Sequence, residues 1–457
     1  FFFFFLSFIF YLTNNSNIRI IMAEILLLLP HQIYQADYFP EGINEVYLYE
    51  HPQYFTKYNF NQKKLVLHRA SLKKHANDLT KKFKVTYIEY NQKLSLTKPY
   101  VMFDPIDKIT ISPKPQEIIE SPNFLLTMED YEKYRKKTHN FMFQAFYMFG
   151  KKINDIIPTV KSQDKKNREK LPKEIKVPPL PTNKNKSDNS FIEEAKNYVK
   201  KNFSKNYGTV DNFQFPISHS QAKKWLDDFI KKRFSKFGPY EDFIVPKEDY
   251  LFHSALSSSI NIGLLHPLEI FKKIKPLQSK IPINSYEGYI RQLYWREYQR
   301  YCYLYGDFKK NYFGYSKKLD KSWYEGTTGI TPVDDAIKDG FDTAYLHHIR
   351  RLMVIGNYMN LCEINPQEGF KWFMEFSIDS YEWVMVQNVL DMVFFVTGGK
   401  TMRKPYISKS NYIIQMSRYT KKEEWSEKWD NKYDSFLKKH KEKLWKFRYS
   451  FPTLKKI

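Results

Sequence analysis

The chain has 457 residues, with 73 Lys or Arg against 50 Asp or Glu, so its formal net charge is +23 at neutral pH. This length allows two or three domains with a sizeable core. The basic surface favours a polyanionic partner, above all nucleic acid; the alternative is a Lys-rich surface that is simply solvated. The only cysteines are Cys302 and Cys362, which excludes a disulfide framework and a four-cysteine metal site and is typical of a reducing compartment.

The chain begins with a nearly continuous apolar run from Phe1 to Leu12. This run is too short to span a bilayer, and no positively charged segment precedes it as in a signal peptide. Met22 stands just before an apolar strand pattern. We therefore expect residues 1–21 to be an unstructured leader with translation starting at Met22, and a cytoplasmic or nuclear protein without a membrane partner. A membrane anchor is the alternative.

Residues 22–150 alternate strand and helix patterns. Three short apolar runs predict buried parallel strands: 25–29, 46–49 and 84–88. Leucine spacing between Lys63 and Leu79 predicts a helix. The alternation predicts an α/β domain with a parallel, doubly wound sheet. No glycine-rich fingerprint follows the first strand, whose turn is Pro30-His31-Gln32, so ordinary dinucleotide binding is not expected there.

A basic, proline-containing stretch separates this domain from the rest of the chain. We expect residues 151–190, which include Pro178-Pro179-Leu180-Pro181, to form an interdomain linker or long surface loop. Its lysines either contact DNA phosphates or belong to a solvated connector.

From Phe191 onward, apolar residues recur at three- and four-residue spacing, which predicts a helical domain over 191–419 and a C-terminal helical extension over 420–457. Ser218 and Asp379 stand where helix N-caps are expected. The helices expected in the large domain are 191–203, 219–234, 266–273, 284–304, 342–362, 366–376 and 380–395.

Two segments contain residue types that bind phosphates or rings. In His253-Ser254-Ala255-Leu256-Ser257-Ser258, small hydroxyl residues precede a helix, where backbone amides and the helix dipole can hold a phosphate; a Ser-rich turn without a ligand is the commoner case. On the next long helix, Arg291, Trp295 and Tyr298 share one face, and a cation beside aromatic rings suits an anionic ring ligand. The alternative is a solvated Arg beside core aromatics.

A third segment, His347-His348-Ile349-Arg350-Arg351, opens another predicted helix. His348 and Arg351 are three positions apart and therefore neighbours. A His exchanges protons near neutral pH, and an Arg can hold a carboxylate, for which Asp379 is a candidate, or stabilise negative charge on a ring. The two histidines are not spaced for one metal, so we expect no metal site. Several aromatic residues would relay electrons beside a redox cofactor and are otherwise core residues: Trp323, Tyr324, Trp372 and Trp383.

Taken in order, these segments resemble the photolyase–cryptochrome superfamily. The residues that carry the resemblance to its flavin domain are Phe237-Gly238-Pro239-Tyr240-Glu241-Asp242, His253 to Ser257 and Ile290 to Glu297. Further stretches resemble the prokaryotic (6-4) photolyases, also called iron–sulfur bacterial cryptochromes and photolyases: 61–71, 167–172, Tyr345 to Met353, and Tyr381 to Val384 with Asn388-Val389. The resemblance covers residues 24–419.

The resemblance implies an FAD cofactor. It places Tyr240, Ser254, Leu256 and Ser257 at the FAD phosphates and ribitol, Arg291 and Trp295 along the U-shaped cofactor, and Arg351 with Asp379 beside the isoalloxazine. His348 and Asn388 join the cofactor contacts. His347 and His348 match the histidines that face the lesion, where one would protonate a (6-4) photoproduct as an electron arrives from reduced FAD. The lesion base would be flipped out of the duplex. Gln32 and Glu50 match contacts of a ribityl-lumazine antenna.

This sequence departs from the family at its iron–sulfur cluster and its electron relay. The positions for cluster cysteines fall near Thr331-Pro332 and at Thr420 and Glu423; because the cluster needs thiolate ligands, we expect none here. Trp425, Trp429 and Trp445 are candidates for a core that holds residues 420–457 instead. The family's adjacent Trp-Tyr pair is Trp372-Phe373, and its more distant Trp falls at Tyr324 beside Trp323.

The sequence therefore predicts a light-driven, FAD-dependent DNA photolyase that repairs UV pyrimidine photoproducts, acting as a monomer on damaged DNA. The pair His347-His348 favours (6-4) lesions. A cryptochrome-like blue-light receptor without repair activity is the alternative, and the altered electron relay is compatible with it. A DNA-binding protein that has lost its flavin is a third interpretation, against which the retained Ser254, Ser257, Arg351 and Asp379 argue.

Overall fold

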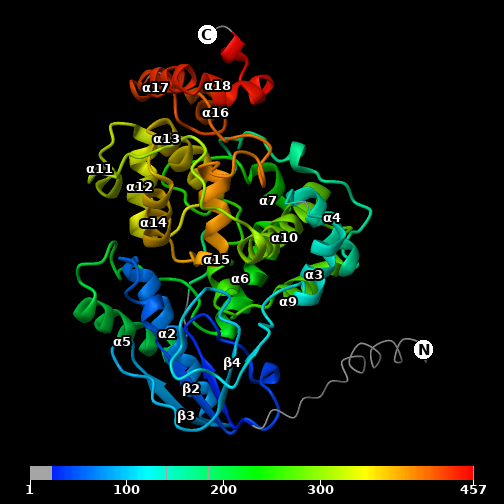
Figure 1. The fold of residues 1–457 in the computed structure, drawn as a ribbon, viewed down its shortest axis with the longest axis vertical. Helices are drawn as coiled ribbons and strands as arrows, with labels where there is room; N and C mark the ends of the chain where they lie inside the picture. The colour runs from blue at the N-terminus through cyan, green and yellow to red at the C-terminus, as the bar shows by residue number, and fades with distance from the viewer. Residues whose placement is uncertain (1–22, 140, 183–185, 422, 456–457) are drawn as a thin grey trace.

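The computed structural model describes residues 23–139, 141–182, 186–421 and 423–455, with an α/β domain at one end and helices stacked over it (Figure 1). The predicted leader, residues 1–21, lies outside the described part. Within that part, no helix is both long enough and apolar enough to cross a membrane.

The sheet has five parallel strands in the order β3-β2-β1-β4-β5. The strands are β1 (Ile25–Leu28), β2 (Glu45–Tyr49), β3 (Lys84–Ile88), β4 (Tyr100–Phe103) and β5 (Glu117–Ile119). In β1 the register pairs Leu26 with Val46 on one side and with Val101 on the other. Every residue of β1 and β4 is buried, because central parallel strands are covered on both faces. The predicted α/β sheet is confirmed, and β4 and β5 were not foreseen.

Two helices pack against each other beside the sheet, α2 (Gln62–Leu79) and α5 (Lys186–Asn202). Arg69 of α2 pairs with Glu194 of α5 at 2.6 Å, and Val199 is fully buried. α5 begins at Lys186, inside the predicted linker, and extends across the predicted domain boundary at residue 191. The division into domains stays a prediction.

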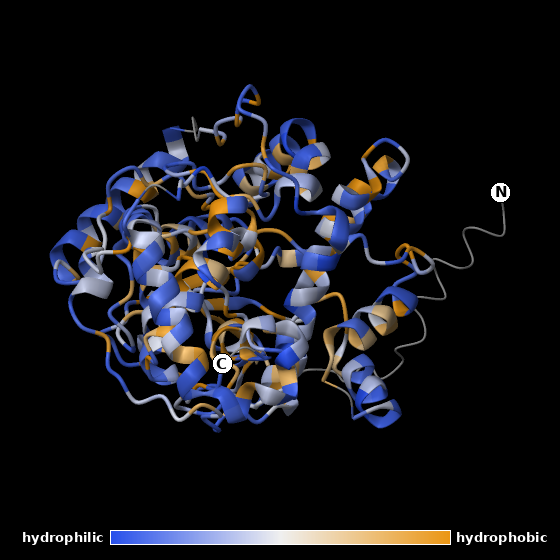
Figure 2. Cartoon of the chain, turned by 90° about the horizontal axis from the view of Figure 1, so that it is seen from above, coloured by the Kyte–Doolittle hydropathy of each residue, from blue (hydrophilic) through white to orange (hydrophobic). Residues whose placement is uncertain are grey.

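The other helices before the C-terminal extension include a long one, α10, which contacts α4, α7 and α15. They are α3 (Met128–Lys137), α4 (Phe143–Ile153), α6 (His219–Lys232), α7 (Phe234–Tyr240), α8 (Ser257–Asn261), α9 (Pro267–Ile274), α10 (Ile283–Tyr305), α11 (Ser322–Glu325), α12 (Thr331–Thr343), α13 (Asn357–Leu361), α14 (Pro366–Phe376), α15 (Glu382–Met385) and α16 (Ser410–Gln415). Apolar residues gather in the interior and hydrophilic residues dominate the outer faces (Figure 2). The predicted all-α C-terminal domain is confirmed.

Two predicted helices are interrupted close to the candidate site residues. The helix expected over 342–362 is wrong at its start, because α12 ends at Thr343 and Ala344 adopts a left-handed conformation with φ 58°, which terminates a helix. The chain then continues as the π-helix η5 (Arg350–Gly356). The helix expected over 380–395 divides into α15 and a second π-helix, η6 (Val386–Val393). Single π-helical turns are frequent at functional sites.

The two expected N-caps have different outcomes. The Ser218 hydroxyl accepts a hydrogen bond from the Gln221 amide at the start of α6, which confirms that cap. The Asp379 prediction is wrong, because α15 begins after Tyr381. The Asp379 carboxylate binds other side chains instead.

The C-terminal extension forms α17 (Trp425–Lys439), α18 (Lys441–Leu444) and the 3₁₀ segment η7 (Trp445–Ser450), the red end of the chain in Figure 1. Trp425 and Trp429 are buried, as predicted, but Trp445 is 46% exposed. The Trp429 indole donates a hydrogen bond to the Ser408 carbonyl at 2.9 Å and packs on Tyr358. Trp445 is therefore not a core residue.

Candidate active site

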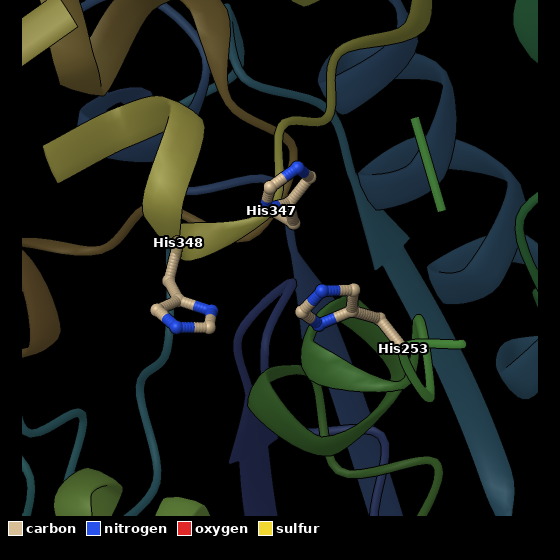
Figure 3. A group of neighbouring side chains, drawn as sticks. All are labelled: His253, His347 and His348. Atoms are coloured by element: carbon tan, nitrogen blue, oxygen red, sulfur yellow. The ribbon is translucent and has the colours of Figure 1, made fainter. Parts of the chain in front are cut away.

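Three histidines from two distant segments meet, His253 from the turn before α8 and His347 with His348 from the segment before η5 (Figure 3). The His253 ring stacks on His347 at 5.0 Å and lies 5.6 Å from His348. His253 and His347 are buried, whereas the His348 side chain is 43% exposed. His253 stands in the Ser-rich segment singled out in the sequence, but its contact with the His pair was not foreseen, because only tertiary folding brings the two segments together.

The rings offer nitrogen atoms within 4.8 Å of one another. Nitrogens that share one tetrahedral zinc ion are about 3.4 Å apart, which lies within this limit, so the three rings could hold a metal ion. A site without metal remains a prediction.

The three histidines differ in their ability to carry a proton. Burial lowers the pKa of His253 to about 3 and holds the pKa of His347 well below its ordinary value. Both nitrogens of His347 and Nε2 of His253 have no hydrogen-bond partner among the described residues. Burial also lowers the pKa of His348, but the charge and hydrogen bond of Asp242 outweigh that effect, so this pKa lies above its usual value. His348 is therefore the member of the cluster that can be protonated near neutral pH.

Asp242, the last residue of the Phe237–Asp242 motif, holds His348 in place. Its Oδ1 lies 3.2 Å from Nε2 of His348, and its Oδ2 accepts a hydrogen bond from Nε of Arg168 at 3.1 Å. Burial raises the pKa of this carboxyl, yet His348 and Arg168 together keep the pKa below its ordinary value. Asp242 was not among the predicted site residues.

Arg351, three residues after His348, forms a bidentate ion pair with Asp379. The guanidinium nitrogens lie 2.9 and 3.2 Å from the two carboxylate oxygens, which confirms the predicted pairing. The Ser257 hydroxyl donates to Asp379 Oδ2 at 2.6 Å, and Ser377 donates to Oδ1. Burial raises the pKa of Asp379, but Arg351 and the hydroxyls outweigh this and keep it ionised. Nε of Arg351 also donates to the Leu346 carbonyl at 2.6 Å, which ties the pair to the His347 segment.

The other predicted cofactor residues lie around this pair or serve local structure. Ser254 is half-buried and accepts a hydrogen bond from the Leu256 amide at 3.4 Å, while Leu256 itself is fully buried. Tyr240 packs on Phe252 at the end of α7. The side-chain amide of Asn388, in η6, donates to the Val384 carbonyl of α15 at 2.8 Å, so this side chain is already engaged by the protein.

Arg291 and Trp295 line a pocket of about 900 Å³ on the α10 side of the site. The Trp295 ring stacks on Phe143 of α4 with centroids 3.8 Å apart and planes 7° apart. The Arg291 guanidinium lies 5.4 Å from the same Phe143 ring. Five further cations line this pocket: Lys161, Lys165, Lys166, Arg403 and Lys404. The first three come from the predicted basic linker, whereas Arg403 and Lys404 were missed.

α7 and α10 connect this pocket to the histidines. Gln292, next to Arg291, donates to Glu241 at 3.5 Å, and Glu241 directly precedes Asp242. Burial raises the pKa of Glu241 to about 7. The wall of the pocket thus lies next to the His348–Asp242 pair.

An aromatic series leads away from the Arg351–Asp379 pair. The Arg351 guanidinium lies 5.3 Å from the Phe376 ring. From there, ring contacts with centroid distances between 4.8 and 5.9 Å join Phe376, Trp372, Phe341, Tyr324 and Tyr207. The Trp372 indole also donates to the Trp323 carbonyl at 2.7 Å. The structure thus brings three predicted relay residues together, whereas Trp383 packs on Phe124 at 5.3 Å instead.

The predicted antenna residues already have protein partners. Glu50 is fully buried and is held by Arg69 at 3.0 Å, Tyr87 at 2.6 Å and Tyr198 at 3.2 Å. The Gln32 amide binds the Leu29 amide and the Phe103 carbonyl. An antenna that contacts either side chain would have to replace these bonds.

The positions of the family's cluster cysteines hold no thiol. Thr331 begins α12, and Thr420 donates a hydrogen bond to Glu423 at 3.3 Å. Tyr419 donates to Asp335 of α12 at 2.8 Å and joins the two regions. Hydroxyl and carboxylate side chains do not fit a cluster that is held by thiolates.

Comparisons with known proteins agree with this architecture. Residues 26–102 and 106–215 match the family model described as deoxyribodipyrimidine photo-lyase-related protein. Residues 289–453 match the model of the FAD binding domain of DNA photolyase. The chain is 34% identical over 271 residues to a (6-4) photolyase of Agrobacterium fabrum; the match covers 56% of this chain and 53% of the relative. The chain thus matches about half the length of this relative.

Solved structures show the same fold. A bacterial class III photolyase from Agrobacterium tumefaciens superposes with a TM-score of 0.55 over 86% of both chains at 15% identity. A cryptochrome from Synechocystis sp. PCC6803 has a TM-score of 0.54 over 91% of this chain and 88% of its own, at 14% identity. Fold and family matches together define a photolyase-type protein with a C-terminal FAD-binding domain. The chain belongs to the photolyase–cryptochrome superfamily, within which it resembles the bacterial (6-4) photolyases.

Proposed function

We propose that this protein is a light-driven, FAD-dependent DNA photolyase that repairs UV pyrimidine lesions, with the (6-4) photoproduct as its substrate. One observation carries the proposal. His348 is partly exposed and kept protonatable by Asp242, while its two neighbouring histidines are buried and neutral. Repair of a (6-4) photoproduct needs such an acid beside the electron source.

The residues around Arg351 and Asp379 fit an FAD. His347 and His253 carry buried ring nitrogens without a partner in the part of the chain that the structure describes, and Ser254 and Ser257 offer hydroxyls in the His253 segment. The Arg351 guanidinium stabilises negative charge on a ring, and Asp379 fixes its orientation. When bound, reduced FAD supplies an electron to the lesion on absorbing light and recovers it after repair.

His348 would move the proton. Nε2 is the nitrogen that faces Asp242, so Nδ1 delivers the proton to the lesion as the electron arrives. The carboxylate of Asp242 stabilises the imidazolium before the transfer. The hydroxyl or amino group on C5 of the 5′ base returns to C4 of the 3′ base and the C6–C4 bond between the two bases breaks. The proton then returns to Nδ1 and the electron leaves the restored pyrimidines, so atoms, protons and electrons balance over the cycle.

The resemblance places Trp295 along the cofactor. We propose instead that the pocket lined by Phe143 and Trp295 receives the flipped lesion, because aromatic faces stack on extruded bases. The surrounding lysines and arginines would bind the flanking phosphates. One chain carries all these groups, so we propose that a monomer is sufficient.

Purified protein with its bound chromophore, illuminated with oligonucleotides that carry either a (6-4) or a cyclobutane lesion, tests the proposal. We expect a flavin absorption band and light-dependent loss of the (6-4) lesion. Absence of the flavin band contradicts the proposal. A flavin band without repair of either lesion would instead identify a cryptochrome-like receptor, and repair of the cyclobutane lesion alone would correct the substrate.

A substitution at the acid tests its role directly. His348→Ala should reduce (6-4) repair by about 100-fold or more, the usual effect of losing a general acid, while the flavin stays bound. His440→Ala is a matched control, because His440 also pairs with a carboxylate, Glu363 at 2.8 Å, but lies in the C-terminal extension. Equal repair by the two variants would remove His348 from the mechanism.

A further inference from the structure

The C-terminal segment η7 presents two aromatic rings to solvent. Trp445 is 46% exposed, and Tyr449, at 76%, is the most exposed large apolar side chain among the residues that the structure describes. Packing inside the protein covers neither ring completely. Aromatic rings that stand exposed in this way are typical of a surface that binds a partner.

Cations surround these rings. The Arg448 guanidinium lies 4.7 Å from the Tyr449 ring and 5.5 Å from the Trp445 ring, and the Lys455 ammonium lies 5.0 Å from Tyr449. Residues 441–455 contain five basic side chains and a single acidic one, Glu442. This charge disfavours a basic or apolar protein partner and favours a polyanion.

The segment adjoins the basic pocket. Ser450, which directly follows Tyr449, is one of the residues that line the pocket. The Lys446 ammonium donates to the Gly398 carbonyl at 2.9 Å. This bond fixes η7 against the loop that carries Arg403 and Lys404, which also line the pocket. A strand that leaves the pocket on this side therefore meets Tyr449.

We propose that Trp445, Arg448 and Tyr449, here called the η7 platform, bind the DNA strand next to the lesion by stacking on its unpaired bases. Base–aromatic stacking tolerates any sequence, because every base has a π-face. Arg448 and Lys446 neutralise the phosphates between the stacked bases. The inference rests on the proposed function for its nucleic-acid partner but not on repair chemistry.

Binding in the dark separates the platform from photochemistry. The full flavin-loaded protein would be titrated against a labelled, undamaged single-stranded oligothymidine, with fluorescence anisotropy as the readout. Tyr449→Ala should weaken binding about fivefold or more, the effect of losing one stacked base, and Tyr449→Phe should bind like the unmodified protein. Tyr38→Ala is the control, because Tyr38 is also exposed, at 38%, but belongs to the α/β domain.

The salt dependence of DNA binding distinguishes base stacking from neutralisation of phosphates. Tyr449→Ala should leave the slope of log Kd against log salt unchanged, whereas Arg448→Gln should reduce that slope by about 0.7, the contribution of one phosphate contact on a single strand. The loss in Tyr449→Ala should be smaller for a fully paired duplex, whose bases are not available to stack.

Three outcomes overturn the inference: equal affinity of Tyr449→Ala and the unmodified protein for the single strand, equal loss in Tyr38→Ala, or failure of Tyr449→Phe to retain binding. Weak binding by Tyr449→Ala supports it even in a protein that repairs no lesion. Intact repair with unchanged single-strand binding by Tyr449→Ala would refute the platform and leave the photolyase proposal standing.

Discussion

His348 and Asp242 form a pair whose chemistry depends on where the proton resides. The carboxylate raises the pKa of His348 above the ordinary value, so the imidazolium persists to higher pH than in a free histidine. Arg168 keeps Asp242 ionised and thereby maintains that effect. The buried, neutral His253 and His347 do not compete for the proton.

The pH dependence of repair tests this pairing. In Asp242→Asn the amide no longer stabilises the imidazolium, so the pKa of His348 falls. In the proposed mechanism protonated His348 is the active form, so the alkaline limb of the repair rate should move to lower pH, with activity recovering as the pH is lowered. Single-turnover repair rates between about pH 5 and 9 would reveal the shift.

Asp339→Asn is the control for that measurement, because Asp339 is ion-paired with Arg350 at 2.6 Å and does not contact the His cluster. A profile for Asp242→Asn that coincides with that of the unmodified protein would show that another group provides the proton.

At the scale of elements, α2 joins the two domains through a pair of adjacent buried lysines. The Lys63 ammonium donates to the Thr209 carbonyl at 2.9 Å. Lys64 donates to the Ser380 carbonyl and lies 4.8 Å from the Tyr381 ring, and burial lowers its pKa to about 7. Ser380 follows Asp379 in the chain. Lys64 thus connects the α/β domain to the segment that holds Arg351.

We expect Lys64→Met to reduce flavin retention, because the Asp379 segment loses its anchor. Lys63→Met is the matched control on the same helix. Lys64→Met leaves the buried Ser380 carbonyl unsatisfied, which costs about 1–3 kcal/mol, whereas water can replace Lys63 at the exposed Thr209, so urea unfolding should show the larger destabilisation in Lys64→Met. The flavin-to-protein ratio after gel filtration should fall in Lys64→Met alone. Equal retention in the two variants would show that Lys64 serves stability only.

The sequence predicts an element well when residues inside it or next to it determine its bounds. α14 matches its predicted range, since Asn365 caps it and Pro366 opens it. η5 and η6 could not be foreseen, because a π-turn needs no change in apolar spacing. β5 has three residues, too few to show a period. β4 has four apolar residues, as β1 has, so its signal was present in the sequence and was missed.

The same distinction applies to the site. The pairing of Arg351 with Asp379 was foreseen as a candidate contact between two named segments. The stack of His253 on His347 and the bond between Asp242 and His348 depend on how α7 meets η5 in space. No spacing along the chain encodes that meeting.

For the whole molecule, the net charge is +23, but the positions of the basic residues decide where a partner binds. Lys161, Lys165 and Lys166 come from the loop after α4, Arg291 from α10, and Arg403 and Lys404 from the loop after η6, yet all line one pocket. Cations that converge from separate segments create a local positive field, which raises the concentration of a polyanion at that place. A composition-level charge indicates the partner class but cannot locate the contact.

Replacing Arg403 and Lys404 together by Gln tests whether the pocket field is the DNA contact. Each phosphate contact contributes about −0.9 to the slope of log binding constant against log salt for duplex DNA, so the double variant should lower the magnitude of that slope by about two. Binding should weaken to a similar extent for all sequences, because phosphate contacts carry no base information. Lys81→Gln with Lys82→Gln removes the same charge from exposed sites on the α/β domain and should leave the slope nearly unchanged. If both double variants lower the slope equally, DNA responds to the total charge of the protein, and the pocket loses its assignment as the place where the strand binds.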